Sequence, residues 1–265
     1  MPASATWRKF EKPLSVAGTL LGACAVWELC VRLFHVPGFL LPPPSRVVAE
    51  FIDSPAYYLY HTGFTLWTTT AGFALSVVIG ALISTAIVYS RFLERTLFTL
   101  LITFNSVPKV ALAPLFVIWL GTGALPKIAI AFTIAVFSIV ISTVFGLRSA
   151  DPDLVALARS ARASEMQILW KIRLPSALPS AFSGMKISIS VALVGAIVGE
   201  FVAGSFGLGQ VILVAQSSFQ TARMFAAIML LGILGTILFY AVELAERWTI
   251  PWHISQRATG RSPTA

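Results

Sequence analysis

Ionisable side chains within long apolar runs are the first candidates for chemistry, because a charge inside a membrane is costly and often marks a functional site. These residues are Glu28, Arg32, Lys109, Glu200 and Glu243. Glu28 and Arg32 are four residues apart and can pair on one helix face, and Glu243 lies near the end of its run. Lys109 can contribute positive potential to a path for anions, although its long stem can also reach the interface. Glu200 has two interpretations, which are lining a polar pathway through the apolar region and making a structural hydrogen bond.

Two further polar candidates lie beside a proline. Asn105 and Ser106 precede Pro108, which interrupts a helix. Irregular backbone at membrane depth is tolerated where it faces a cavity, so these two side chains are candidates for lining a pore. A packing kink without solute contact is the alternative. If the chain forms a path through a membrane, the residues predicted to line this translocation path are Asn105, Ser106, Lys109 and Glu200.

Familiar catalytic and metal-binding patterns are absent from the sequence. It contains no G-x-x-x-x-G-K-[ST], no H-E-x-x-H and no G-x-S-x-G, the patterns that cradle ATP phosphates, hold zinc or position a nucleophilic serine. The histidines His35, His61 and His253 lie outside the apolar runs, and Cys24 and Cys30 match no disulfide or metal spacing. We therefore expect no catalytic residue, no metal site and no cofactor in this chain.

The elements that must position these residues are membrane helices. Of the 265 residues, 57% are hydrophobic and only 11% are charged, whereas charged residues make up about 25% of a typical soluble domain. A bilayer core of roughly 30 Å requires about 20 apolar residues per helical span. Six runs approach that length: Leu14–Leu33, Gly63–Tyr89, Leu97–Leu120, Ile128–Leu147, Ile187–Val202 and Met224–Ala245. The prolines after Leu41 cannot continue a helix, and the stretch through Asp53 and His61 is expected to be a surface helix or loop. The sequence predicts an all-α membrane protein with about six transmembrane helices, in one transmembrane domain over residues 1–265.

Basic residues indicate how these helices are oriented. The formal charge is +8, but the basic residues are scattered between apolar runs and form no patch for nucleic acid. With the N-terminus inside, the basic residues on the cytoplasmic side outnumber the others by roughly three to one, as the positive-inside rule expects. The inner set is Arg8, Lys9, Lys12, Arg91, Arg95, Arg148, Arg159, Arg162, Lys171, Arg173, Lys186, Arg247, Arg257 and Arg261. Both termini are therefore expected in the cytoplasm.

The first apolar run has an alternative interpretation as a signal peptide. Three basic residues precede Leu14–Ala23, and the segment Leu21–Cys24 is similar to a lipoprotein cleavage site. The mostly apolar run continues to Leu33, however, which is longer than a usual signal core. This length favours an uncleaved first helix.

The largest hydrophilic interruption, residues 148–186, is patterned as two short helices. Asp151-Pro152-Asp153 supplies an N-cap carboxylate, a proline at the first helical position and a second acid in the first turn. Ser164 and Gln167 have the spacing of a capping box, and Leu174-Pro175 is expected to end the second helix. We expect an ordered cytoplasmic loop that presents a surface to a partner. A loop that only connects two membrane helices is the alternative.

The loop resembles the E-A-A-x-x-x-G loop of bacterial ABC importer permeases. The residues that carry this resemblance are Ala156–Ser164, Ile168, Leu174-Pro175 and Leu178-Pro179. A wider resemblance, over residues 40–215, is to permeases of the nitrate, sulfonate, taurine and bicarbonate type. Its residues are Leu41-Pro42, Pro108, Ala111–Leu115, Trp119, Gly121–Gly123, Glu200 and Gly207–Gly209.

Two positions depart from the loop pattern of that family. Ala156 stands where glutamate is usual, and Arg162 stands where glycine is usual. Glycine permits a left-handed turn between the two short helices, and a residue with a side chain costs roughly 1 kcal/mol more in that conformation. Either the turn differs in this chain, or the partner surface accommodates the arginine.

The resemblance implies a type I ABC importer permease architecture and a role as one subunit of an ATP-driven importer. The second short helix is then the coupling helix, seated in a groove of a separate ABC ATPase that binds ATP and Mg. The residues that take this role by the resemblance are Ala158, Arg162, Ala163, Ser164, Glu165, Met166, Ile168, Leu169 and Arg173. The resemblance further implies a second permease copy, a periplasmic or extracellular solute-binding protein, and a bacterial inner membrane whose lipid surrounds the helices. It favours a small organic or inorganic anion as the solute.

A stand-alone secondary transporter or channel is the rival from another class. It would require charges that face one another across helices or an inverted repeat of broken helices, and the two halves of the sequence show no clear repeat. A membrane-embedded enzyme would require a cluster of histidine, acidic or cysteine residues on facing helices. The sequence favours an importer subunit without enzymatic activity of its own over both rivals.

Overall fold

The structure is a computed structural model that describes the backbone of residues 4–251. The side chains described are those of residues 18–251, other than 20, 91, 97, 98, 101, 102, 105 and 106, so several residues used above lie outside the described set: Arg8, Lys9, Lys12, Leu14–Ala17, Arg91, His253, Arg257 and Arg261. All regular elements in this part of the chain are helices, as the sequence predicts. The longest are α1 (Ser4–Leu33), α3 (Pro55–Tyr89), α6 (Ala124–Arg148), α9 (Leu174–Val202) and α11 (Thr221–Thr249).

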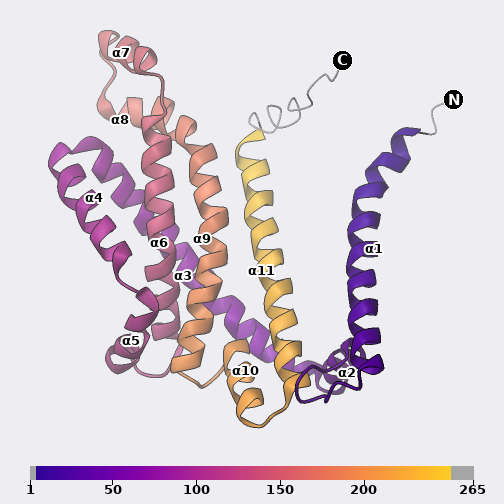
Figure 1. Ribbon diagram of the computed structural model, residues 1–265. Helices are drawn as coiled ribbons and strands as arrows, with labels where there is room; N and C mark the ends of the chain where they lie inside the picture. Colours follow the sequence, from indigo (N-terminus) through magenta and orange to yellow (C-terminus); the bar gives the residue numbers. More distant parts are fainter. Residues whose placement is uncertain (1–3, 252–265) are drawn as a thin grey trace.

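Helices α3, α6, α9 and α11 form the body of the protein, and α1 stands apart from them beyond α11 (Figure 1). The amphipathic helix α2 (Pro44–Asp53) joins α1 to α3. At the same end of the body lie α5 (Ala113–Leu120) and α10 (Leu208–Ser217), whereas α7 (Pro152–Ser160) and α8 (Glu165–Ile168) lie at the opposite end. The last turn of α11 also lies at the end that carries α7 and α8.

Four segments within the described residues are long and apolar enough to cross a membrane: Pro55–Tyr89, Ala124–Arg148, Glu165–Val202 and Thr221–Thr249. Four predicted spans are thereby confirmed as helices long enough to cross a membrane. They are Gly63–Tyr89, Ile128–Leu147, Ile187–Val202 and Met224–Ala245. The backbone of the predicted first span lies within the single helix α1.

The third predicted span, Leu97–Leu120, is wrong as one continuous helix. Helix α4 (Arg91–Ser106) ends before Pro108, and a 3-10 turn, η1 (Lys109–Leu112), leads into α5. Proline has no N–H for the helical hydrogen bond, and it forces the residue before it into extended backbone. Val107 accordingly has φ −75° and ψ 130°. The hydropathy pattern did not define this break because apolar residues continue on both sides of it.

Small residues bring α6 into close contact with both α3 and α9. A Cβ atom added to Gly72 of α3 would lie 2.6 Å from the Cβ of Ala131 in α6. One added to Gly195 of α9 would lie 2.8 Å from the Cα of the same alanine. In lipid, where burial of apolar surface gives helices little reason to associate, this close approach supplies the packing that holds them together.

Hydroxyl groups add hydrogen bonds between the same helices. The buried Ser84 of α3 donates to the Val140 carbonyl of α6 at 3.2 Å. Ser188 of α9 donates to the Ala135 carbonyl of α6 at 3.1 Å. Bonds of this kind contribute roughly 0.6 kcal/mol each in a membrane protein, so they support the glycine contacts and do not replace them.

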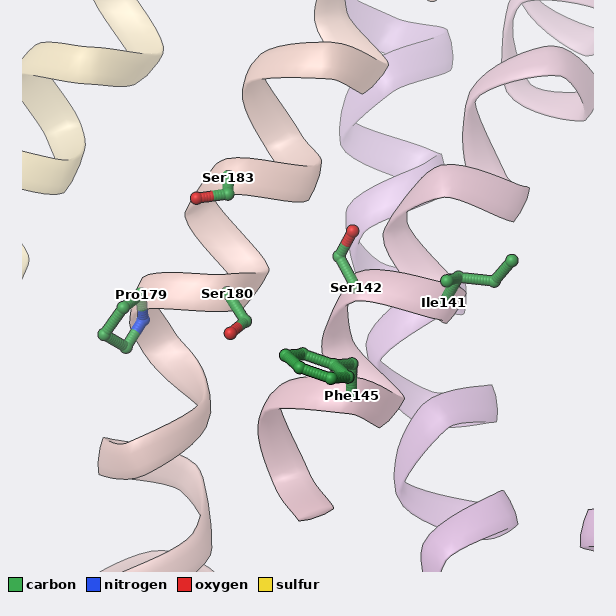
Figure 2. Close-up of a pocket in the computed structure, with 6 residues that line it drawn as sticks. All are labelled: Ile141, Ser142, Phe145, Pro179, Ser180 and Ser183. Atoms are coloured by element: carbon green, nitrogen blue, oxygen red, sulfur yellow. The ribbon is translucent and has the colours of Figure 1, made fainter. Parts of the chain in front are cut away.

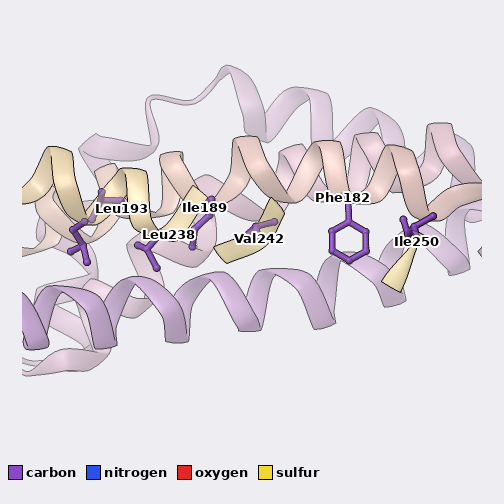
Figure 3. Close-up of a cluster of buried hydrophobic side chains, with 7 residues drawn as sticks. Phe182, Ile189, Leu193, Leu238, Val242 and Ile250 are labelled. Carbon is purple, nitrogen blue, oxygen red and sulfur yellow. The ribbon is translucent and has the colours of Figure 1, made fainter. Parts of the chain in front are cut away.

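The other side of α9 packs against α11 through apolar side chains (Figure 3). The cluster consists of Phe182, Ile189, Leu193, Leu234, Leu238, Val242 and Ile250. Lys186 of α9 and Glu246 of α11 form an ion pair within this interface, with side-chain exposures of 12% and 4%. Because removing one partner leaves a buried charge unpaired, this pair fixes how α11 sits against α9.

The contact at Gly72 provides a test of the helix packing. Gly72→Ala places a methyl group 2.6 Å from Ala131, and we expect this overpacking to lower the free energy of unfolding by about 1–3 kcal/mol. Gly232→Ala is the matched control, because no atom lies within 4 Å of an added Cβ there. Thermal unfolding of the detergent-solubilised protein should give a lower midpoint for Gly72→Ala alone. Equal midpoints for the two variants would contradict the close contact of α3 with α6.

Candidate functional site

Helix α7 begins as the sequence predicts. Asp151 is its N-cap, and the carboxylate accepts a hydrogen bond from the Asp153 N–H at 2.8 Å. Pro152 occupies the first helical position, where its missing N–H removes no helical hydrogen bond. The Asp153 carboxylate interacts favourably with the positive end of the helix dipole. These local interactions define the start of a helix that is only nine residues long.

Helix α8 begins in the predicted capping box. The Ser164 hydroxyl accepts from the Gln167 N–H at 3.3 Å, and the Ser164 N–H donates to Gln167 Oε1 at 2.8 Å. The Tyr89 hydroxyl, at the end of α3, donates to the Glu165 carbonyl at 3.0 Å. Arg159 of α7 pairs with the Glu165 carboxylate at 3.0 Å. Helix α8 is therefore attached both to α7 and to the body of the protein.

The predicted helix end at Leu174-Pro175 is wrong. Helix α8 continues through a π-helical turn, η2 (Leu169–Arg173), directly into α9, which gives one segment over Glu165–Val202. The Leu174 N–H donates to the Leu169 carbonyl five residues earlier. The wider π turn makes room for the ring of Pro175, which in a regular helix would clash with the carbonyl four residues before it. The loop is thereby continuous with a helix that is long enough to cross the membrane.

Arg162 adopts the left-handed conformation, with φ 60°. The Ala163 N–H donates to the Ala158 carbonyl and the Arg162 N–H to the Arg159 carbonyl, both at 2.9 Å. This is the pair of bonds of a Schellman motif, in which glycine is the usual residue. The sequence left open whether the turn at position 162 differs from the glycine turn of the family. The structure excludes a different turn. The arginine adopts the turn that glycine favours.

Substitution of Arg162 tests this strain. Arg162→Gly removes a penalty of roughly 1 kcal/mol, so we expect slower amide hydrogen exchange in the loop. Arg162→Val adds a β-branched side chain in the same conformation and should speed the exchange. Ala156→Gly, on the exposed side of α7, is the matched control, because glycine inside a helix destabilises it by about 1 kcal/mol. Faster exchange for Arg162→Gly than for the native chain would contradict the left-handed turn.

The apolar residues of α8 and η2 divide into an exposed and a buried set. Met166 and Trp170 are each 63% exposed, whereas Ile168 and Leu169 are 0% and 9% exposed. Ile168 packs against apolar residues of α7 and of the linker before it. The surface open to a partner is therefore formed by Met166 and by Trp170, which the sequence analysis did not single out. Ile168 and Leu169 hold α8 against the body, and their side chains present no surface for the expected groove contacts.

A cleft of about 330 Å³ lies between the two short helices. Its lining includes four of the expected coupling residues, which are Ala158, Arg162, Ala163 and Ile168. Of the other polar ones, Ser164 and Glu165 are exposed. Arg173 is half-buried, with its guanidinium 5.6 Å from the centre of the Tyr89 ring. The expected coupling residues therefore lie together at one end of the protein.

The predicted path residues, in contrast, occupy separate places. Asn105 and Ser106 form the last turn of α4, and their side chains lie outside the described residues. Lys109 lies in η1, and its ammonium is 5.2 Å from the centre of the Phe137 ring of α6. Glu200 is completely buried near the end of α9.

Glu200 makes structural hydrogen bonds at the end of the body opposite to α7. Its carboxylate accepts from the Thr65 hydroxyl of α3 and from the Gly209 N–H of α10, both at 2.7 Å. The Thr65 hydroxyl in turn accepts from the Leu208 N–H at 2.9 Å. Gly207 has φ 118° and lies against the carboxylate so closely that an added Cβ would collide with it. Only glycine adopts this backbone conformation readily.

His61 joins this network, although the sequence placed it outside the membrane spans. Helix α3 begins at Pro55, so His61 lies in its second turn. The ring is buried, and Nδ1 accepts a hydrogen bond from the Gly207 N–H at 3.1 Å. One signal was available in the sequence, because His61 and Thr65 are four residues apart and share a helix face.

Lys127 is a buried residue that does not belong to the basic set predicted for the cytoplasmic side. It lies in the first turn of α6 and is 0% exposed. Its ammonium donates to the Phe206 carbonyl at 3.1 Å and lies 4.4 Å from the centre of the Phe64 ring. Together with Glu200 and His61, it fixes the turn before α10 to α3, α6 and α9.

Replacement of Glu200 tests this network. Glu200→Ala leaves the Thr65 hydroxyl and the Gly209 N–H without their acceptor, and each unsatisfied group costs about 1–3 kcal/mol. Glu200→Gln retains an acceptor oxygen, so it should lose less. Thermal unfolding in detergent is the measurement, with the midpoint of the glutamine variant expected between those of the alanine variant and the native chain. A native-like midpoint for Glu200→Ala would exclude a structural role for these bonds.

A helical membrane body with a capped loop at one end agrees with the class that the sequence predicts, a transport permease. More narrowly, the chain belongs to the family described as "binding-protein-dependent transport system inner membrane component", whose model matches residues 34–250. It is the translocation subunit of an ATP-driven importer, and the resemblance noted from the loop residues is confirmed. The family is one of transport permeases and not of enzymes.

Curated relatives align over almost the whole chain. The formylaminopyrimidine transport permease protein ThiX of Halalkalibacterium halodurans is 33% identical over 232 residues, 87% of this chain and 92% of that protein. The riboflavin transport system permease protein RibX of Chloroflexus aurantiacus is 34% identical over 257 residues, 96% of each chain. The taurine transport system permease protein TauC of Escherichia coli is 26% identical, over 89% of this chain and 88% of that protein.

The fold is also that of a solved ABC transporter. An inward-facing form of the MetNI methionine ABC transporter aligns with a TM-score of 0.63 and 24% identity, over 71% of this chain and 93% of that chain. At this identity the similarity concerns the fold alone. It confirms the predicted all-α, type I importer permease architecture.

Proposed function

We propose that two copies of this chain form the solute path of an importer in a bacterial inner membrane, and that a separate ABC ATPase docks on residues 148–186. The ATPase binds ATP and Mg, and the chain itself carries no cofactor. Residues 1–265 act as a single permease domain, and a periplasmic or extracellular binding protein delivers the solute. The observation that carries this proposal is the exposed, capped helix α8, which is continuous with the membrane-length helix α9.

The continuous segment Glu165–Val202 acts as a lever in this proposal. When two ATPases close around ATP, a displacement of α8 passes through η2 into α9 without a flexible joint. Tyr89 passes part of the same displacement to α3, because it is hydrogen-bonded to the Glu165 carbonyl. Arg148 and Glu94, paired at 2.6 Å, connect the end of α6 to α4. Alternating access then consists of opening the path outward when the ATPases close and inward after hydrolysis.

The orientation follows from the position of the loop. If the ATPase docks on α7 and α8, that end of the protein is cytoplasmic, and both termini lie on the same side by the positive-inside distribution. The network around Glu200 then lies at the outer end. There it fixes α10 and the turn before it, on the side from which a binding protein approaches.

Two classes of solute are candidates. The first class is a small anion, which the positive charge of Lys109 favours. Several relatives are named for solutes of this class, such as the taurine and nitrate permeases. The two relatives at 33% and 34% identity are named for formylaminopyrimidine and riboflavin, which are nitrogen heterocycles.

Co-purification of the tagged chain with its ATPase tests the proposal. Ala163→Arg combined with Glu165→Arg puts bulky positive charge on the coupling surface and removes the Glu165 partner of Arg159. We expect recovery of the ATPase with this variant to fall by about tenfold or more, since charged groups buried without partners at the centre of an interface are strongly unfavourable.

The matched control carries two arginines at the opposite end of the protein. Ser218 and Gln220 are exposed beyond α10, and Ser218→Arg with Gln220→Arg should recover the ATPase as the native chain does. Size-exclusion chromatography shows whether each variant is folded. If the native chain recovers no ATPase in any mild detergent, the proposal fails, and a stand-alone secondary transporter or channel becomes the leading alternative.

A further inference from the structure

A pocket of about 480 Å³ opens between α6 and α9, one to two turns from the loop (Figure 2). We call it the α6–α9 pocket, and its lining is Ile141, Ser142, Phe145, Pro179, Ser180 and Ser183. In Figure 2, Ser142 and Phe145 of α6 lie toward α9, and Ser180 of α9 points back toward the Phe145 ring. Volumes of about 300–1,000 Å³ are typical of sites for small molecules.

Three hydroxyl groups of the pocket are available for hydrogen bonds. Within the part of the chain that the structure describes, Ser142, Ser180 and Ser183 have no hydrogen-bond partner. Several other hydroxyls of the membrane helices donate to the carbonyl four residues earlier, as those of Ser84 and Thr133 do at 2.6 Å and 2.7 Å, whereas the buried hydroxyls of Thr62 and Thr69 in α3 have no partner. Such local bonding is the usual arrangement for serine and threonine inside a helix. Free hydroxyls at membrane depth call for a polar partner from outside the chain, such as water or a solute.

The same hydroxyl groups also supply acceptors. A serine hydroxyl carries one O–H donor and two acceptor lone pairs. The pocket can therefore both donate and accept hydrogen bonds.

The charge and shape of the pocket separate the two classes of solute. None of the six lining residues is ionisable, whereas a small oxyanion is held best by arginine or lysine through charge-assisted hydrogen bonds. Arg148, the next charged residue along α6, is paired with Glu94 at 2.6 Å. Phe145 is 70% exposed, and an aromatic ring in this position can stack with a planar ring.

We propose that the α6–α9 pocket contacts the solute on its way through the membrane, and that it suits an uncharged planar nitrogen heterocycle. The heterocycle stacks on Phe145, and its ring nitrogens and polar substituents bond to the hydroxyls of Ser142 and Ser180, with Ser183 at the edge of the pocket. This inference rests on the proposed function and deepens it, because it assigns a solute class to the path. The pocket lies where the lever of α8 and α9 begins, so solute contact and ATPase docking meet at the same end of the protein.

Riboflavin, a fluorescent planar heterocycle, is a direct probe of the pocket. We expect its fluorescence to be quenched when it binds the permease–ATPase complex in lipid nanodiscs, and formylaminopyrimidine to compete. Taurine and nitrate should not compete at the same concentrations. Absence of riboflavin binding, or stronger competition by taurine or nitrate, would overturn the assignment.

Variants of the pocket assign the binding to these residues. Phe145→Ala should raise the Kd for riboflavin about threefold to tenfold, the range for loss of one aromatic stacking contact, and Phe145→Tyr should restore binding. The triple variant Ser142→Ala, Ser180→Ala and Ser183→Ala should also bind more weakly. Ser190→Ala is the matched control, because this serine lies on α9 outside the pocket and donates to the Lys186 carbonyl at 3.4 Å. Native affinity in both pocket variants would overturn the assignment.

Accessibility in the assembled complex is the second measurement. Ser180→Cys, in a chain with Cys24→Ser and Cys30→Ser, should react with a small thiol reagent, and riboflavin should slow the reaction. A cysteine that does not react in the complex would show that water, and hence a polar solute, does not reach the pocket, and the assignment would fail. ATPase recovery is followed in the same preparations. If the ATPase is recovered but no heterocycle binds, only the assignment of the α6–α9 pocket is contradicted. If no ATPase is recovered, the proposed function is contradicted.

Discussion

The close packing of α6 between α3 and α9 is the contact on which the rest of the structure depends. Gly72 and Gly195 approach Ala131 from two sides, and neither position has room for a side chain. Helix α6 also ends where the loop begins and forms one wall of the α6–α9 pocket. The positions of the loop and of the pocket therefore both follow from how tightly these three helices pack.

The two ends of the body are stabilised in different ways. The loop end is built mainly from local interactions, which are the caps of α7 and α8 and the turn at Arg162, and the Tyr89 hydroxyl attaches α8 to α3. The opposite end is held by buried side chains that are far apart in sequence, such as Thr65 and Glu200. Local capping permits the loop to move as a unit, whereas the buried network ties the turn before α10 to three helices at once. This difference agrees with the proposal that an ATPase drives the subunit from the loop end.

The sequence predicted the features that depend on nearby residues and on hydropathy. The cap at Asp151, the capping box at Ser164 and four membrane-length helices were all predicted from such patterns. Prolines were the difficult case, since the helix breaks at Pro108 but continues through Pro175, which follows a π turn, and through Pro179 inside α9. The buried position of Lys127 could not be predicted either, because its partners come from the tertiary structure.

The π turn at η2 also determines how far α8 is rotated about the axis of α9. A regular helix turns by about 100° per residue, and a π turn holds one residue more than the helix around it. The face that α8 presents to a partner is therefore out of phase with the face that α9 turns toward α6. Deleting a single residue within Leu169–Arg173 would leave both helices intact but swing Met166 to a different side of the shared axis. The length of this one turn thus determines which direction a docked partner faces.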